Sequence, residues 1–160
     1  MGLFDKLKQA ANFVTGNSAI VNIRTESPVN SKSAPIKFII DAQTKDSSVN
    51  VRNVYLKIRS VEQVEVLDSD THTDEDGKTH RSSEVVRESE TVFSIDLQVS
   101  GSEELAPNSS HSWEFEYNIP SSENPTYRGR KAQHIWQMYA GLDTAGNDPD
   151  SGWNTFEVSC

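Results

Sequence analysis

The sequence is poor in the features that mark secreted or membrane-spanning proteins. Its 160 residues include one cysteine, Cys160, which is the last residue. A single cysteine cannot form an internal disulfide or a cysteine-rich zinc site. No apolar run approaches the ~20 residues that a membrane-spanning helix needs. Lysine and glutamine interrupt the N-terminal apolar residues, which argues against a signal peptide. We therefore expect a cytoplasmic protein.

Basic residues are also scarce, with 15 lysines and arginines against 24 acidic residues and a net charge of −9. This balance argues against binding to nucleic acid. The acidic excess is local, because thirteen acidic residues but only three basic ones lie between Glu62 and Glu104. That segment carries −10 and the rest of the chain +1. It predicts either a solvated hairpin or a docking surface for a basic partner or a cation.

Recognisable catalytic motifs are missing. The sequence has no G-x-S-x-G motif and no glycine-rich loop before a helix, so neither a hydrolase triad nor a phosphate cradle is indicated. Glu114 and Glu116 lie on one side of an alternating pattern, which is typical of the solvated face of a strand. We expect no enzymatic activity and no cofactor.

Most of the chain follows the period of a β-strand. Trp113, Phe115 and Tyr117 alternate with polar residues until Ile119-Pro120, where proline cannot continue the ladder. Other β-rich runs predict strands at residues 19–23, 35–42, 49–67, 78–88, 92–99, 132–142 and 153–158, and the long run over residues 49–67 is either one bent strand or two. Eight or nine short strands separated by turns predict a β-sandwich over residues 17–160.

The first 16 residues have a different period. Apolar residues recur at helical spacing and predict a short amphipathic α-helix; the stripe includes Leu3, Phe4, Leu7 and Val14. A helix this short is marginal alone in water, so it must dock on something. It packs on the sandwich or, alternatively, lies on a membrane surface or in the groove of a partner.

The acidic segment contains the strongest turn signal in the chain. Glu75-Asp76-Gly77 suits a three-residue hairpin loop with glycine in the left-handed conformation. This loop would place His72 opposite His80, close to three aspartates that we treat as candidate binding residues; they are Asp70, Asp74 and Asp76. The two histidines could bind a transition metal, although exposed histidines on a polar hairpin are the simpler interpretation.

One basic cluster follows the strand pattern at residue 117. Arg128, Arg130 and Lys131 could contact an acidic partner or could pair with the acidic hairpin within the same molecule. The sequence alone does not rank these two roles.

Three stretches of the chain resemble the arrestin fold, and within it the bacterial sporulation-control proteins. They are Phe4-Asp-Lys-Leu-Lys8, the run from Val51 to Ile58, and the block from Pro107 to Asp143, which includes Pro125-Thr126-Tyr127 and Ala140-Gly141-Leu142-Asp143. The resemblance implies an arrestin-like (immunoglobulin-like) β-sandwich with a short N-terminal helix. Such relatives usually carry two lobes, whereas this chain holds one.

The same resemblance implies a regulatory or scaffolding role in a bacterial cytoplasm, without chemistry of its own. We therefore expect a non-catalytic adaptor that binds a protein through the helix, the acidic hairpin or an exposed sheet edge. Sheet edges would also allow a homo-oligomer. The alternatives are a peripheral membrane protein anchored by the helix and metal binding at His72 and His80.

Overall fold

The structure, a computed structural model, describes residues 18–160. The predicted N-terminal helix, with Leu3, Phe4, Leu7 and Val14, lies outside these residues. The described part of the chain is all-β and contains the following strands: β1 (Ala19–Thr25), β2 (Val29–Ser31), β3 (Ile36–Thr44), β4 (Val49–Val51), β5 (Asn53–Thr73), β6 (Thr79–Ser100), β7 (Glu103–Leu105), β8 (Ser110–Tyr117), β9 (Tyr127–Arg128), β10 (Ala132–Asp143) and β11 (Asn154–Ser159).

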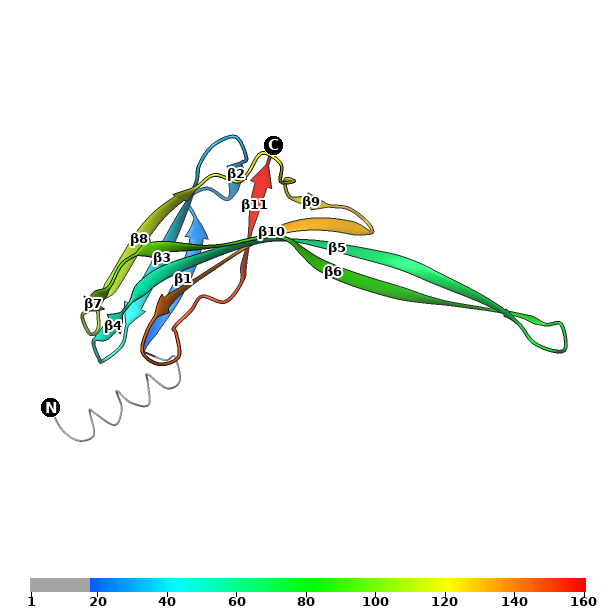
Figure 1. The fold of residues 1–160 in the computed structure, drawn as a ribbon, viewed down its shortest axis with the longest axis horizontal. Helices are drawn as coiled ribbons and strands as arrows, with labels where there is room; N and C mark the ends of the chain where they lie inside the picture. The colour runs from blue at the N-terminus through cyan, green and yellow to red at the C-terminus, as the bar shows by residue number, and fades with distance from the viewer. Residues whose placement is uncertain (1–17) are drawn as a thin grey trace, which may run out of the picture.

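The strands form two main layers (Figure 1). One sheet has the order β1-β3-β8, and the other has the order β2-β11-β10-β5-β6 with β9 paired to β10. Neighbouring strands run antiparallel except β11 and β2, which are parallel. The short strands β4 and β7 pair with each other at the end of the sandwich where the two layers meet.

The core lies between the inner faces of the two sheets. Phe38 and Ile40 of β3 and Leu56 and Ile58 of β5 are fully buried, as alternate residues of each strand face inward. Trp136 of β10 lies in this core and donates its indole N–H to the backbone carbonyl of Asn124, in the loop before β9 (3.0 Å). Burial of these large apolar side chains supplies the main driving force for folding.

The predicted alternation in β8 is confirmed. Trp113, Phe115 and Tyr117 pack against the core, whereas Glu114 and Glu116 are exposed. The strand ends at Tyr117, just before the Ile119-Pro120 stop.

The region from residue 49 to residue 99 differs from the prediction. Of the two alternatives for residues 49–67, one bent strand or two, the structure has two strands, β4 and β5, and β5 continues beyond the predicted end as far as Thr73. The expected strands 78–88 and 92–99 are one strand, β6, with a bulge. Ser60 pairs with Phe93 and Val61 with Thr91, so Val92 has no opposite residue in the β5–β6 ladder. This extra residue reverses the alternation of β6 relative to β5.

The hairpin of β5 and β6 extends far beyond the sandwich (Figure 1). Strand β10 accompanies β5 only as far as Val64, and beyond this point β5 and β6 form a two-stranded ribbon. We call residues 62–90 the arm. Nine further residues of β5, at ~3.4 Å each, give the ribbon a reach of about 30 Å past β10.

Candidate functional site

The tip of the arm has the predicted turn. Asp74 and Lys78 are joined by a backbone hydrogen bond of 3.0 Å, and Gly77 donates to the carbonyl of Asp74 at 3.0 Å. Gly77 has φ of 74°, the left-handed conformation that glycine adopts without steric cost. His72 lies directly opposite His80, so the predicted register is confirmed.

The structure lends no support to a metal site at these histidines. His80 donates a hydrogen bond from Nε2 to the Asp74 carboxylate (3.0 Å), so one of the two rings already has a partner. Asp70 lies opposite Ser82 in the ladder, and Asp76 lies in the loop. Within residues 18–160, no group of three histidine, cysteine, aspartate or glutamate residues is arranged to hold a metal ion.

The two faces of the arm differ sharply in charge. Opposite residues of a ladder share a face, and successive residues alternate between faces. The inner face continues the core-facing side of the sheet and, among the strand residues of the arm, has no lysine or arginine; its acidic residues are Glu62, Asp68, Asp70, Glu84, Glu88 and Glu90. The outer face carries Glu65, Arg81 and Arg87. The strand residues therefore contribute −6 on the inner face and +1 on the outer face.

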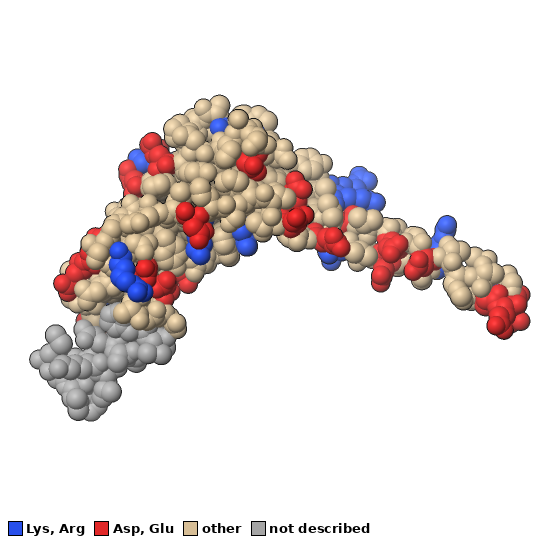
Figure 2. Space-filling model, viewed as in Figure 1, with Lys and Arg blue, Asp and Glu red and all other residues tan. Residues whose placement is uncertain are grey.

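The inner face includes two pairs of like charges. Glu62 lies opposite Glu90, and Asp68 lies opposite Glu84. Like charges directly opposite each other destabilise a sheet. On the outer face, by contrast, Arg87 pairs with Glu65 at 2.8 Å. Figure 2 shows acidic side chains along the arm as far as its tip, with basic side chains at few places.

Apolar side chains on the arm are exposed on both faces. Val66 lies opposite Val86 on the inner face, and Leu67 lies opposite Val85 on the outer face. Val66 and Leu67 are each 55% exposed, although apolar side chains of this size are usually buried. Since a two-stranded ribbon has no third layer to cover it, these valines and leucine remain available for contact.

The arm also presents unpaired backbone. β6 is an edge strand of its sheet over its full length. On the other side of the ribbon, Glu65 donates its backbone N–H to the carbonyl of Lys131 at 2.7 Å, and beyond it β5 has no neighbour other than β6 within residues 18–160. Such edges can accept an added strand.

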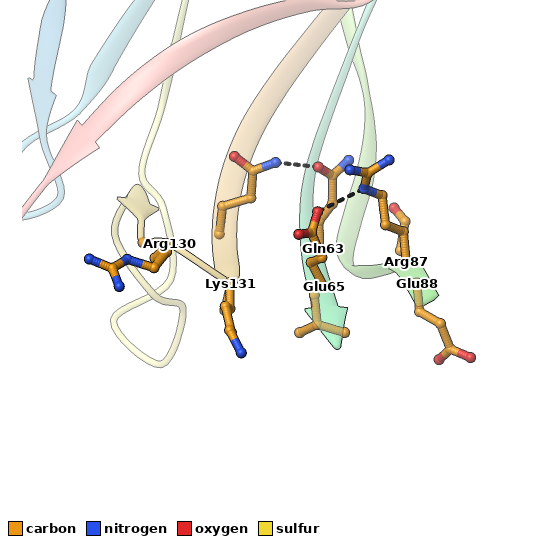
Figure 3. Close-up of a pocket in the computed structure, with 11 residues that line it drawn as sticks. Gln63, Glu65, Arg87, Glu88, Arg130 and Lys131 are labelled. Atoms are coloured by element: carbon orange, nitrogen blue, oxygen red, sulfur yellow. Dashed lines mark hydrogen bonds and ion pairs between the residues drawn. The ribbon is translucent and has the colours of Figure 1, made fainter. Parts of the chain in front are cut away.

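The predicted basic cluster is divided between two places. Arg128 pairs with Glu157 at 2.5 Å within the sandwich. Arg130 and Lys131 line a cavity of about 450 Å³ at the root of the arm, and Figure 3 shows Lys131 between Arg130 and the paired side chains of Glu65 and Arg87. Neither Arg130 nor Lys131 forms an ion pair with a residue of the described chain, so pairing with the acidic hairpin is not observed.

A second cavity of about 370 Å³ lies at the same root and has a more apolar lining. It is lined by Val64, Pro125, Tyr127 and His134, together with Glu62. His134 is only 4% exposed, and its Nδ1 lies 3.0 Å from the carbonyl oxygen of Pro125. Its Nε2 has no hydrogen-bond partner in the part of the chain that the structure describes. Sequence reasoning missed this cavity, because its walls come from three segments that are separated in the chain.

A polar cavity lies at the other end of β10, between Tyr55, Tyr139 and the loop that contains Asp148 and Asp150. The two tyrosine rings stack with centroids 6.2 Å apart. Burial, together with Asp150, raises the pKa of Tyr139 to about 12, and burial also raises the pKa of Tyr55. Both hydroxyls therefore stay protonated at neutral pH.

Among residues 18–160, no helix has the length and apolar character required to cross a membrane.

Comparison with known proteins identifies the fold. The sequence matches no protein-family model, and a search of curated proteins finds no match. The structure is similar to the crystal structure of Spo0M, a sporulation control protein from Bacillus subtilis, with a TM-score of 0.58 and 16% sequence identity. The match covers 89% of this chain and 50% of the Spo0M chain, so this chain spans about half the length of that protein. The resemblance to sporulation-control proteins is thus confirmed for the fold.

Proposed function

We propose that this protein is a non-catalytic regulatory adaptor of the cytoplasm that binds another protein through its arm. The observation that carries the proposal is the ribbon itself. It extends about 30 Å past its last neighbouring strand and exposes apolar side chains on both faces. A folded protein gains little stability from such a ribbon, because the ribbon adds no buried core.

The fold supports a regulatory role by analogy. Spo0M, whose fold this chain shares, is described as a sporulation control protein. Fold alone does not define function, so the proposal depends on the arm, where exposed apolar pairs and unpaired strand edges are typical of surfaces that bind proteins.

The test compares the intact protein with a variant that lacks most of the arm. Residues 66–86 are replaced by Asn-Gly, which forms a two-residue hairpin turn between Glu65 and Arg87. Both proteins are used to capture partners from the source organism. We expect the intact protein to retain a defined partner that the shortened variant loses.

The melting temperature of the shortened variant serves as the control for folding. We expect it to stay close to that of the intact protein, since the removed residues are exposed. If the shortened variant captures the same partners as the intact protein, the arm is not the docking element and the proposal fails.

A further inference from the structure

The charge pattern of the arm is costly for the protein alone. Glu62–Glu90 and Asp68–Glu84 are like-charge pairs, and no lysine or arginine shares their face among the strand residues of the arm. Each such pair destabilises the ribbon. The outer face, built from the same two strands, avoids this cost through the Arg87–Glu65 pair. Acidic composition alone therefore does not explain why the carboxylates are concentrated on one face.

The 370 Å³ cavity at the root of the arm, which we call the root cavity, adds an independent feature on the same face. His134 lies opposite Glu62 in the β10–β5 ladder, and both line this cavity. Among residues 18–160, the buried Nε2 atom of His134 has no hydrogen-bond partner, and a backbone group of a bound segment would provide one. Tyr127 and Pro125 provide an apolar wall beside it.

We infer that the inner face of the arm binds an extended basic segment of a partner protein, with an apolar residue of that segment in the root cavity. This inference rests on the proposed function of the arm as a docking element. Acidic side chains two residues apart on a strand are spaced by about 7 Å, which matches alternate side chains of another extended chain. Asp68 and Asp70 have this spacing, as do Glu88 and Glu90.

A basic partner fits this face better than a second copy of the same protein. The chain has a net charge of −9, and its inner face contributes −6, so two inner faces would repel each other. A lysine- or arginine-rich segment would neutralise both like-charge pairs, and its attraction would weaken as salt is added.

The test uses fluorescence anisotropy with the full chain and a synthetic peptide. The probe is a fluorescein-labelled peptide of about twelve residues in which lysine alternates with threonine and one end carries leucine. A matched peptide has glutamine in place of lysine. We expect the lysine peptide to bind more tightly at ~50 mM than at ~150 mM NaCl, and the glutamine peptide not to bind.

Two double variants with the same change in net charge locate the site. Asp68→Asn with Glu84→Gln removes one inner-face pair, and Glu104→Gln with Glu116→Gln removes two exposed carboxylates of the sandwich. We expect the first to weaken lysine-peptide binding roughly 2- to 30-fold, as for two exposed ionic contacts, and the second to leave it unchanged. Unfolding cannot explain the loss, because removing like charges does not destabilise the ribbon.

The cavity is tested separately with Tyr127→Ser. We expect weaker binding of the leucine-ended peptide and unchanged binding of a peptide that lacks the leucine. Equal losses in the two double variants, or equal binding of lysine and glutamine peptides, would overturn the inference. If either of these two results is obtained while the variant with the shortened arm still fails to capture the partner, the inference fails and the proposed function stands. If the shortened arm loses nothing, the proposed function fails.

Discussion

Two residues on one face of β5 allow a direct test of how the arm differs from the sandwich. Ile58 and Val66 lie on the same strand, eight residues apart, and face the same side of the sheet. Ile58 is fully buried, whereas Val66 is 55% exposed. Substituting alanine at each position therefore compares a core residue with an arm residue in the same strand.

The expected costs follow from burial. Ile58→Ala leaves a cavity in the core and should lower the free energy of unfolding by about 2–5 kcal/mol. Val66→Ala removes the equivalent of two methylene groups, worth about 0.8 kcal/mol each when fully buried. Because Val66 is 55% exposed, less than half of that applies, and the expected cost is about 0.7 kcal/mol.

Urea denaturation measures both free energies of unfolding and thermal denaturation measures both melting temperatures; tryptophan fluorescence reports each, since Trp136 is buried in the core. In a protein of this size, 1 kcal/mol corresponds to about 2–4 °C in melting temperature. Ile58→Ala should therefore lower the Tm by about 4–20 °C, and Val66→Ala by less than about 3 °C. Val86→Ala, which truncates the residue opposite Val66, is the matched control and should behave like Val66→Ala. If Val66→Ala costs as much as Ile58→Ala, the arm is part of the cooperative core, and the reasoning about a free docking ribbon is wrong.

Three further outcomes are expected. Asp68→Asn with Glu84→Gln removes a like-charge pair and should raise the free energy of unfolding by about 0.2–1 kcal/mol. The gain should be larger at low salt than at high salt. No gain at any salt concentration would show that the two carboxylates do not interact. Gly77→Ala, at φ of 74°, should speed hydrogen exchange at the amides of Asp74 and Lys78 without changing exchange in β10, because left-handed backbone disfavours alanine; unchanged exchange at the tip would contradict the turn. The pKa of Tyr139 is raised to about 12, so Tyr139 loses its phenolic proton at lower pH in the unfolded state than in the folded state. Its contribution to stability should therefore be complete below pH 10 and fall as the pH rises from 10 towards 12. Tyr139→Phe should flatten that fall in urea titrations, and an unchanged slope would refute the raised pKa of Tyr139.

Local patterns in the sequence were enough to predict much of the fold. Strand β8 was predicted because its inward residues alternate with polar ones over the whole strand. The arm turn was predicted from Gly77, whose backbone conformation few other residues adopt. These features depend on residues close together in the chain.

The continuity of β6 could not be predicted in the same way. The polar residues Ser89, Glu90 and Thr91 suggested a break between two strands, because period-two alternation is visible only where one face of a strand is buried. On the arm neither face is buried, so the alternation of apolar and polar residues is absent from this part of β6. The segregation of charge was also hidden, since it depends on the cross-strand register and the bulge at Val92.

The root cavity depends on long-range pairing. Its lining combines Val64 of β5, Tyr127 of β9 and His134 of β10, and these strands meet only in the folded sheet. Apart from the Pro125-Thr126-Tyr127 turn, the sequence contains no local pattern that predicts the pairing of these three strands. The unpaired His134 Nε2 likewise becomes apparent only from packing.

The cross-strand register of the arm restricts how its length can change in evolution. Deleting two residues from each strand would shorten the ribbon by about 7 Å and leave every side chain on its present face. Deleting one residue from each strand would instead exchange the faces of the distal ribbon, because the side-chain period is two. Asp68 and Glu84 would then move to the outer side, away from the root cavity. Homologous arms that keep the acidic inner face should therefore differ in length by steps of two residues per strand.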